Sequence, residues 1–192
     1  LSREQGTSFS PLCIVMQGCF AGSHLRDHIG ETDCSIKTKP QLKKFFNMDT
    51  CPSFNPGGDI AATDILLSCN NIPKYFVSKN VCHAVIYTPS IAAALAELGT
   101  TMPHMKLLHT LFAKYLSPVT NKAMHDPFAV ACAISLLSSD NSSIVHWLHN
   151  VEISHQKEGK RGVCWRADKS SLITNTSITL ALPVDFESVF ID

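Results

Sequence analysis

The residues best suited to chemistry are His125 and Asp126, which stand side by side and are followed by Pro127. Proline fits the first turn of a helix, because its fixed φ is already helical and its missing N–H needs no partner there. We therefore expect a helix to begin here, with Asp126 at or next to its N-cap, where the helix dipole favours a carboxylate. The segment 128–137 is almost entirely apolar, so we expect this helix to be buried. Such a polar pair can form a site; the alternative is that Asp126 is only a cap and His125 only its neighbour.

Polar residues also follow two predicted strands. The runs 12–16 and 75–77 are short and apolar, which is typical of buried parallel strands. Gln17 follows the first run, and Asn80 and His83 follow the second. Because ligands of open α/β sheets bind beyond the carboxyl ends of the strands, we expect these three residues at one rim. The alternative for His83 is a histidine whose bonds are satisfied within the fold, and the residue type does not decide the role of Gln17.

The elements that position these residues alternate between helices and strands. Asp59 is expected to cap a helix over 60–68, and Ser90 a helix that runs to Leu98. Pro103 opens a helix over about 104–116, whose regularly spaced apolar residues are typical of a core. The pattern predicts one α/β domain over 1–192, with a mixed, mainly parallel sheet flanked by helices.

The last part of the chain has a different pattern. Strand-like spacing begins near residue 144, so the segment 143–182 is expected to form antiparallel strands, with a turn at 159–162. A short helix is expected at 184–191. The stretch 23–51 shows no clear period and is interpreted as an inserted, solvated surface loop.

Composition excludes several classes of protein. Sixteen basic residues balance sixteen acidic ones, which argues against a surface that binds nucleic acid by neutralising phosphates. No apolar run is long enough for a membrane span, and the N-terminal residues do not have the form of a signal peptide. The eight cysteines include no CxxC pair and no zinc-like spacing. We expect buried free thiols and a reducing compartment, most simply the cytoplasm.

Several segments together resemble one known family. The stretch Met124-His125-Asp126-Pro127-Phe128-Ala129-Val130-Ala131 resembles the C-terminal signature of the inosine-uridine preferring nucleoside hydrolases, in which a His-Asp-Pro triplet opens an active-site helix. The segments that resemble the family's earlier blocks, in the same order, are 14–22, 51–62 and 77–83. The resemblance extends over most of the chain.

The resemblance implies hydrolysis of the N-glycosidic bond of ribonucleosides, with a calcium ion that holds both the attacking water and the ribose diol. Asp126 would be a calcium ligand that also contacts the ribose, and His125 would help the base depart. Asn55 would hold sugar hydroxyls, although an asparagine there can also serve only to shape a turn. Gln17 stands where the family often has a methionine near the ribose. His83 matches a strand-end histidine of less certain role.

One hallmark of the family has no counterpart in this sequence. The Asp-rich run that closes the family's first strand supplies the base and most calcium ligands, and nothing here matches it. Ser53 stands where the family often has a glutamate. We therefore expect the N-terminal strands to be absent from this chain, and a partner chain or missing segment to complete the sheet in an oligomer. We expect calcium to bind only if that partner chain or segment supplies the missing aspartates.

Two interpretations follow. In the first, the chain is the C-terminal portion of a nucleoside hydrolase that is active once completed. In the second, it is a catalytically inactive hydrolase-like subunit, kept as a structural or interaction module in a larger assembly.

Overall fold

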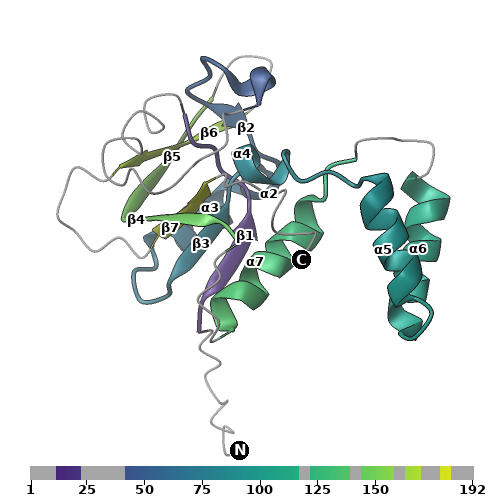
Figure 1. Ribbon diagram of the computed structural model, residues 1–192. Helices are drawn as coiled ribbons and strands as arrows, with labels where there is room; N and C mark the ends of the chain where they lie inside the picture. Colours follow the sequence, from purple (N-terminus) through teal and green to yellow (C-terminus); the bar gives the residue numbers. More distant parts are fainter. Residues whose placement is uncertain are drawn as a thin grey trace, which may run out of the picture.

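The main sheet has four strands in the part of the chain that this computed structural model describes, residues 12–22, 42–116, 122–138, 144–157, 163–169 and 178–182. Their order is β1 (Ile14–Gln17), β3 (Lys74–Val77), β7 (Ile178–Leu182) and β4 (His146–His149). The first three are parallel, and β4 runs antiparallel to β7. With helices beside this sheet (Figure 1), the predicted mixed, mainly parallel α/β fold is confirmed.

A second, antiparallel sheet packs beside the first. Its order is β2 (Cys51–Pro52), β6 (Val163–Lys169) and β5 (Val151–Lys157). One core joins the two sheets, in which buried Trp165 and Val151 cluster with Phe76 and Leu180. Antiparallel pairs are therefore present after residue 143, but β7 also extends the main sheet in parallel with β3. The predicted turn at 159–162 and helix at 184–191 lie outside the described residues.

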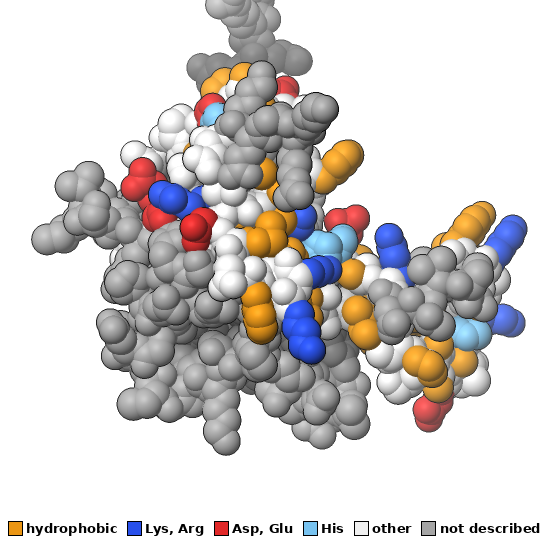
Figure 2. All heavy atoms as spheres, turned by 90° about the horizontal axis from the view of Figure 1, so that it is seen from above, with side chains coloured by type: hydrophobic (Ala, Val, Ile, Leu, Met, Phe, Trp, Pro, Cys, Tyr) orange, Lys and Arg blue, Asp and Glu red, His pale blue; other side chains and the backbone are white. Residues whose placement is uncertain are grey.

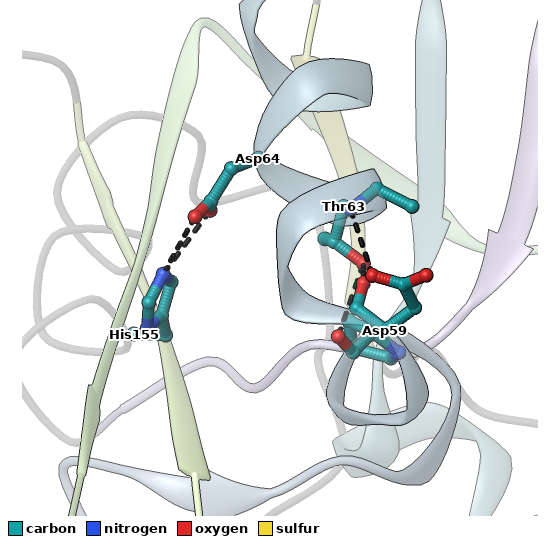
Figure 3. Close-up of polar contacts among 6 residues, drawn as sticks. Asp59, Thr63, Asp64 and His155 are labelled. Atoms are coloured by element: carbon teal, nitrogen blue, oxygen red, sulfur yellow. Dashed lines mark hydrogen bonds and ion pairs between the residues drawn. The ribbon is translucent and has the colours of Figure 1, made fainter.

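Helix α3 (Ile60–Ser68) follows the short helix α2 (Phe54–Gly58) and begins as the sequence predicts. An Asp59 carboxylate oxygen accepts a hydrogen bond from the Ala62 amide at 3.0 Å, and the Thr63 hydroxyl donates to the Asp59 carbonyl at 2.9 Å. Asp64 follows Thr63 in the chain, and its Oδ1 atom lies 3.1 Å from Nε2 of His155 on β5 (Figure 3). This pair ties α3 to the second sheet.

Helices α5 (Pro89–Leu98) and α6 (Pro103–Leu116) form a hairpin that stands apart from the two sheets (Figure 1). Near the base of the hairpin, where the chain enters it and leaves it, the Tyr87 N–H donates a hydrogen bond to the Lys122 carbonyl at 2.8 Å. Helix α5 is capped by Thr88 rather than Ser90, and it begins one residue earlier than predicted. The predicted core face of α6 was Leu108, Leu111, Phe112 and Tyr115. The prediction is wrong for Leu108, Leu111 and Tyr115, which are exposed, whereas Phe112 is half-buried and contacts the Tyr87 ring.

Helix α7 (His125–Leu137) differs from the prediction in two ways. It begins at His125 after Met124, so Asp126 is not the N-cap but lies in the first turn. Pro127 still fits, because the amide groups of the first turn have no helical partner. The prediction of a buried helix is wrong for one face: α7 packs on β1 and buries Phe128 and Cys132. The large apolar residues left exposed on the helix are Val130, Ile134 and Leu137.

The cysteines agree with the sequence reading as far as the structure describes them. Cys13, Cys19, Cys51, Cys69, Cys82, Cys132 and Cys164 are free thiols, most of them buried. No helix within the described ranges has both the length and the apolar character needed to cross a membrane.

Candidate functional site

The candidate site lies at the carboxyl ends of β1 and β3, where the chain makes a tight turn. Gly18 N–H donates to the Val77 carbonyl at 3.0 Å, which joins the two strand ends. Gly18 has a φ of 155°, and a Cβ there would lie 2.9 Å from Pro56 Cδ, so glycine is required for both backbone conformation and space. Cys19 follows with a φ of 64°, a left-handed conformation that is costly for a non-glycine residue. The turn at this rim of the sheet is therefore strained, and neighbouring residues must hold it in this conformation.

Asn80, in the short helix α4 (Lys79–Cys82), is part of what holds this turn. Its side-chain oxygen accepts from the Ala21 amide at 2.9 Å, and its nitrogen donates to the Ala21 carbonyl at 3.0 Å. Asn80 is buried. The sequence placed Asn80 at the rim, and its position is there, but its carboxamide is committed to the backbone rather than offered to a ligand.

Gln17 and Asn55 form one polar unit at the end of β1. Asn55 Nδ2 donates to both the backbone carbonyl and the side-chain Oε1 of Gln17, at 2.9 Å in each case. Ser53, two residues before Asn55, is buried, and its hydroxyl accepts a hydrogen bond from the Cys19 amide at 3.1 Å. Ser53 is thus a structural residue, while the exposed Asn55 and the partly buried Gln17 remain at the surface of the rim.

His83 and His125 form the second unit, from the end of α4 and the start of α7. Their ring centroids lie 4.5 Å apart with an angle of 57° between the planes. Lys44 Nζ lies 2.8 Å from His83 Nδ1. Because an ammonium group can only donate, Nδ1 accepts this bond and the proton of the neutral His83 ring is on Nε2. His125 Nε2 is buried and has no hydrogen-bond partner in the described structure.

Positive charges crowd this second unit. Burial, followed by Lys44, His125 and Lys79, lowers the pKa of His83 to about 4. Burial also lowers the pKa of His125, with Lys122 adding to the effect and Asp126 opposing it. Both imidazole rings are therefore neutral near pH 7, and they interact through hydrogen bonds rather than as charged imidazolium groups.

Cys82 is influenced by residues of both units. Burial raises the pKa of its thiol to about 12, while a hydrogen bond with Gln17 lowers it and the charge of Asp126 raises it further. The thiol donates to the Val77 carbonyl at 3.3 Å. Gln17 hydrogen-bonds with Cys82 and the charge of Asp126 acts on the same thiol. Direct contacts among the predicted site residues join Gln17 to Asn55 and His83 to His125.

Sequence reasoning missed the two lysines of this rim. Lys44 lies in the 3-10 helix η1 (Lys43–Phe45), within the stretch interpreted as a solvated loop. Part of that stretch is packed instead, because Phe45 is buried against Phe20 and Cys51. The spacing of Leu42, Phe45 and Met48 was the available signal. Lys79 donates from Nζ to the Pro52 carbonyl at 2.6 Å.

The described residues do not fit a calcium ion by themselves. Calcium takes six to eight oxygen ligands, largely from carboxylates. Asp126 is a single carboxylate next to histidines and lysines, and no group of three or more His, Cys, Asp or Glu side chains within the described ranges could hold a metal. Any calcium site at Asp126 needs further oxygen ligands from elsewhere.

Comparison with solved structures identifies the fold. A plant nucleoside hydrolase, the PpNRh1 enzyme, aligns over 70% of this chain with a TM-score of 0.51 and 23% sequence identity. A purine-preferring ribonucleoside hydrolase from Gardnerella vaginalis aligns over 68%, with a TM-score of 0.47 and 20% identity. No family model and no curated protein matches the sequence. The alignment with the plant enzyme shows that the chain has a nucleoside-hydrolase-like fold. The chain spans 44% of the length of the plant enzyme and 40% of the length of the Gardnerella enzyme.

Proposed function

We propose that this chain carries the sugar- and base-facing part of a nucleoside hydrolase site, and that it hydrolyses the N-glycosidic bond of ribonucleosides when completed by an Asp-rich segment or chain. The observation that carries the proposal is the arrangement at the rim. His125 Nε2 is buried without a partner, beside the ring of His83 and next to Asp126. A buried polar atom without a partner in the fold is a place where a ligand can bond.

The roles proposed for the residues follow from their chemistry. Cleavage passes through an oxocarbenium-like sugar, so the departing base and the ribose hydroxyls both need polar partners. His125 is neutral near pH 7, and we assign it a hydrogen bond to the departing base. Asp126 and the Asn55–Gln17 unit are assigned to the ribose, since Gln17 and Asp126 both act on the same residue, Cys82. His83 supports the His125 ring through their contact.

Calcium and a partner belong to the same proposal. The bound ion would polarise the attacking water, and Asp126 would be one of its ligands, with the remaining carboxylates supplied by the completing segment. Strand β1 lies at the edge of the main sheet among the described strands, next to α7 (Figure 1). An open strand edge is a template for pairing with another strand. We propose that the completing segment pairs with β1.

The test of activity uses the chain in the assembly recovered with it under native conditions. Common purine and pyrimidine ribonucleosides are incubated with calcium, and released base is measured by chromatography. Replacing Asp126 with alanine should lower turnover by at least about 100-fold. The matched control is Asp64→Ala, which removes an aspartate that contacts His155 away from the rim. Unchanged turnover in the Asp126 variant would refute the proposal.

Ser53 favours the alternative of an inactive structural subunit. Its buried hydroxyl is bonded to the Cys19 amide, so this position offers no charged contact to a sugar. An assembly that holds the chain, contains calcium and an Asp-rich partner, and still releases no base from any ribonucleoside would support this second function over the first.

The partner is tested separately. Size-exclusion chromatography with mass measurement should show the chain in a complex or oligomer rather than as a stable monomer of 21.0 kDa. Protection of β1 amides from hydrogen exchange in the complex is expected. A well-folded monomer with fully protected β1 amides would contradict pairing at this edge.

A further inference from the structure

Helix α7 has one apolar side that stays exposed. The opposite side packs on β1 and buries Phe128 and Cys132. Val130, Ile134 and Leu137 are 59%, 63% and 69% exposed. Their spacing of four and three residues places them on one side of the helix, and we refer to these three residues as the α7 stripe. A helix that is apolar on all sides is typically buried on all sides, so we expect another polypeptide to cover the α7 stripe.

The α7 stripe leads to the candidate site. Asp126 is exposed and stands four residues before Val130, so it lies on the same side of the helix, about one turn closer to the N-terminus. His125, the first residue of α7, packs against the His83 ring. The start of α7 is therefore at the rim. A polypeptide that runs along the α7 stripe reaches Asp126 at one of its ends.

Other exposed apolar side chains do not have this relation to the site. Hydrophobic side chains stand out on the α5–α6 hairpin (Figure 2), and Leu107, Leu111 and Tyr115 are among the exposed ones. The hairpin, however, stands apart from the two sheets (Figure 1). Ile65 is 67% exposed, but it belongs to α3, which is tied to the second sheet. The α7 stripe is distinguished because it continues directly into a proposed site residue.

The chemistry at Asp126 indicates what covers the α7 stripe. A calcium ion takes most of its six to eight oxygen ligands from carboxylates and carbonyls, and residues 125–137 contain no acidic residue besides Asp126. If a second copy of the chain packed its own α7 stripe here, α7 would supply at most one further carboxylate. The surroundings of Asp126 therefore fit a different polypeptide better, one with apolar side chains along its length and carboxylates at one end.

We propose that the α7 stripe is the docking surface for an amphipathic helix of the segment or chain that completes the site, and that the end of this helix nearest the rim brings carboxylates to Asp126. A row of side chains spaced by about four residues forms the ridge that fits between the ridges of a second helix. The chain spans 44% of the plant hydrolase, so a protein of this fold has further polypeptide for such a helix. The role of the carboxylates rests on the proposed function, whereas docking depends on the α7 stripe alone.

The first experiment identifies what covers the α7 stripe. The photo-crosslinking residue benzoylphenylalanine replaces Ile134 in the full chain, which is purified in the assembly it forms and then irradiated. Mass spectrometry identifies the crosslinked peptides. Ile65 is the matched control position, because it is an isoleucine of nearly equal exposure on another helix. We expect position 134, and not position 65, to crosslink to a peptide with helical apolar spacing and acidic residues near one end.

Charged variants measure how much the contact contributes to assembly. Ile134→Asp should weaken the assembly by at least about tenfold, because it places an unpaired charge in an apolar contact. Ile134→Leu keeps the apolar surface and should leave the assembly unchanged. Ile65→Asp introduces the same charge on α3 and should also leave it unchanged. Mass photometry over a series of concentrations gives the dissociation constants, and circular dichroism checks that each variant is folded.

The outcomes separate docking from the proposed function. The proposal is overturned if the chain is a stable monomer, if position 134 crosslinks to a second copy of the chain or to a peptide without acidic residues, or if Ile134→Asp assembles as tightly as Ile65→Asp. If Ile134→Asp loses the assembly while the unaltered assembly releases no base, docking is supported and only the hydrolase function fails. If Ile134→Asp keeps both the assembly and its turnover, docking fails and the hydrolase function stands.

Discussion

Two histidines of this protein have similar aromatic surroundings and opposite electrostatic ones. His155 on β5 lies 4.7 Å from the Trp165 ring, and its Nε2 is 3.1 Å from an Asp64 carboxylate oxygen. His83 at the end of α4 lies 5.5 Å from the Phe45 ring, and its Nδ1 is 2.8 Å from the Lys44 ammonium. The first histidine has a negative partner, and the second has a positive one.

The difference separates a structural contact from a site. The Asp64–His155 pair joins α3 to the second sheet and needs nothing more from its surroundings (Figure 3). The Lys44–His83 contact places a second cation-forming group against a lysine, with Lys79 and His125 also acting on it. Groups with shifted pKa values and specific charged neighbours are concentrated at functional sites. The predictions below test this contrast.

The largest expected effect concerns Cys82, the buried residue that precedes His83 in the chain. The pKa of Cys82 is raised to about 12, whereas a free thiol has a pKa of about 8.5, so about 10³-fold less reactive thiolate is present. We expect Cys82 to resist alkylation at pH 8 while the partly exposed Cys13 and Cys69 react. Mass spectrometry of peptides after timed alkylation measures this. Rapid labelling of Cys82 in the folded protein would mean that the rim is open.

The next effect concerns Asn80, whose side chain holds the backbone of the turn at Ala21. Asn80→Ala removes both hydrogen bonds to Ala21. We expect the free energy of unfolding to fall by about 1–3 kcal/mol, at about 0.5–1.5 kcal/mol for each hydrogen bond lost. Urea denaturation followed by circular dichroism measures the change. Asn55→Ala is the control, since Asn55 is exposed, and this substitution should lower the free energy of unfolding much less. Equal losses in the two variants would show that the Asn80 side chain does not hold the turn.

The third effect is the pH response of His83. Its pKa of about 4 in the folded protein lies below the value of about 6.5 in an unfolded chain. Protons then bind more readily to the unfolded state, so the stability due to a neutral His83 is complete above pH 6.5 and is lost as the pH falls toward 4. Lys44→Met should raise the pKa of His83 in an NMR titration. A pKa that stays the same in this variant would remove Lys44 as a cause of the shift.

The smallest effect concerns the structural pair. Asp64→Ala should lower the free energy of unfolding by less than about 1 kcal/mol, because exposed ion pairs contribute little. Lys44→Met should leave it unchanged or raise it slightly, because it removes a repelling charge. Urea denaturation of both variants compares them directly. A larger loss from the Lys44 variant would indicate that the Lys44–His83 contact stabilises the fold, and would weaken the contrast drawn here.

Several features of the fold were predictable because they depend on local chemistry. The cap of α3 at Asp59, the strands that end at Gln17 and Val77, and the start of α7 next to Pro127 follow from capping, apolar runs and the fixed φ of proline. Burial was less predictable. Helix α7 is apolar on all sides, so its sequence does not indicate which face meets β1 and which stays exposed at Val130 and Ile134.

By itself the sequence determined the fold class and the candidate residues, because periodicity and residue type are local properties of the chain. It placed Gln17, Asn80 and His83 at a common rim, since parallel strands end on the same edge. Only the tertiary structure decided which charges meet there. Lys44 reaches His83 across 39 positions of sequence, and Asn80 turns inward to hold Ala21. Such long-range contacts depend on how the loops pack, and no local pattern encodes them.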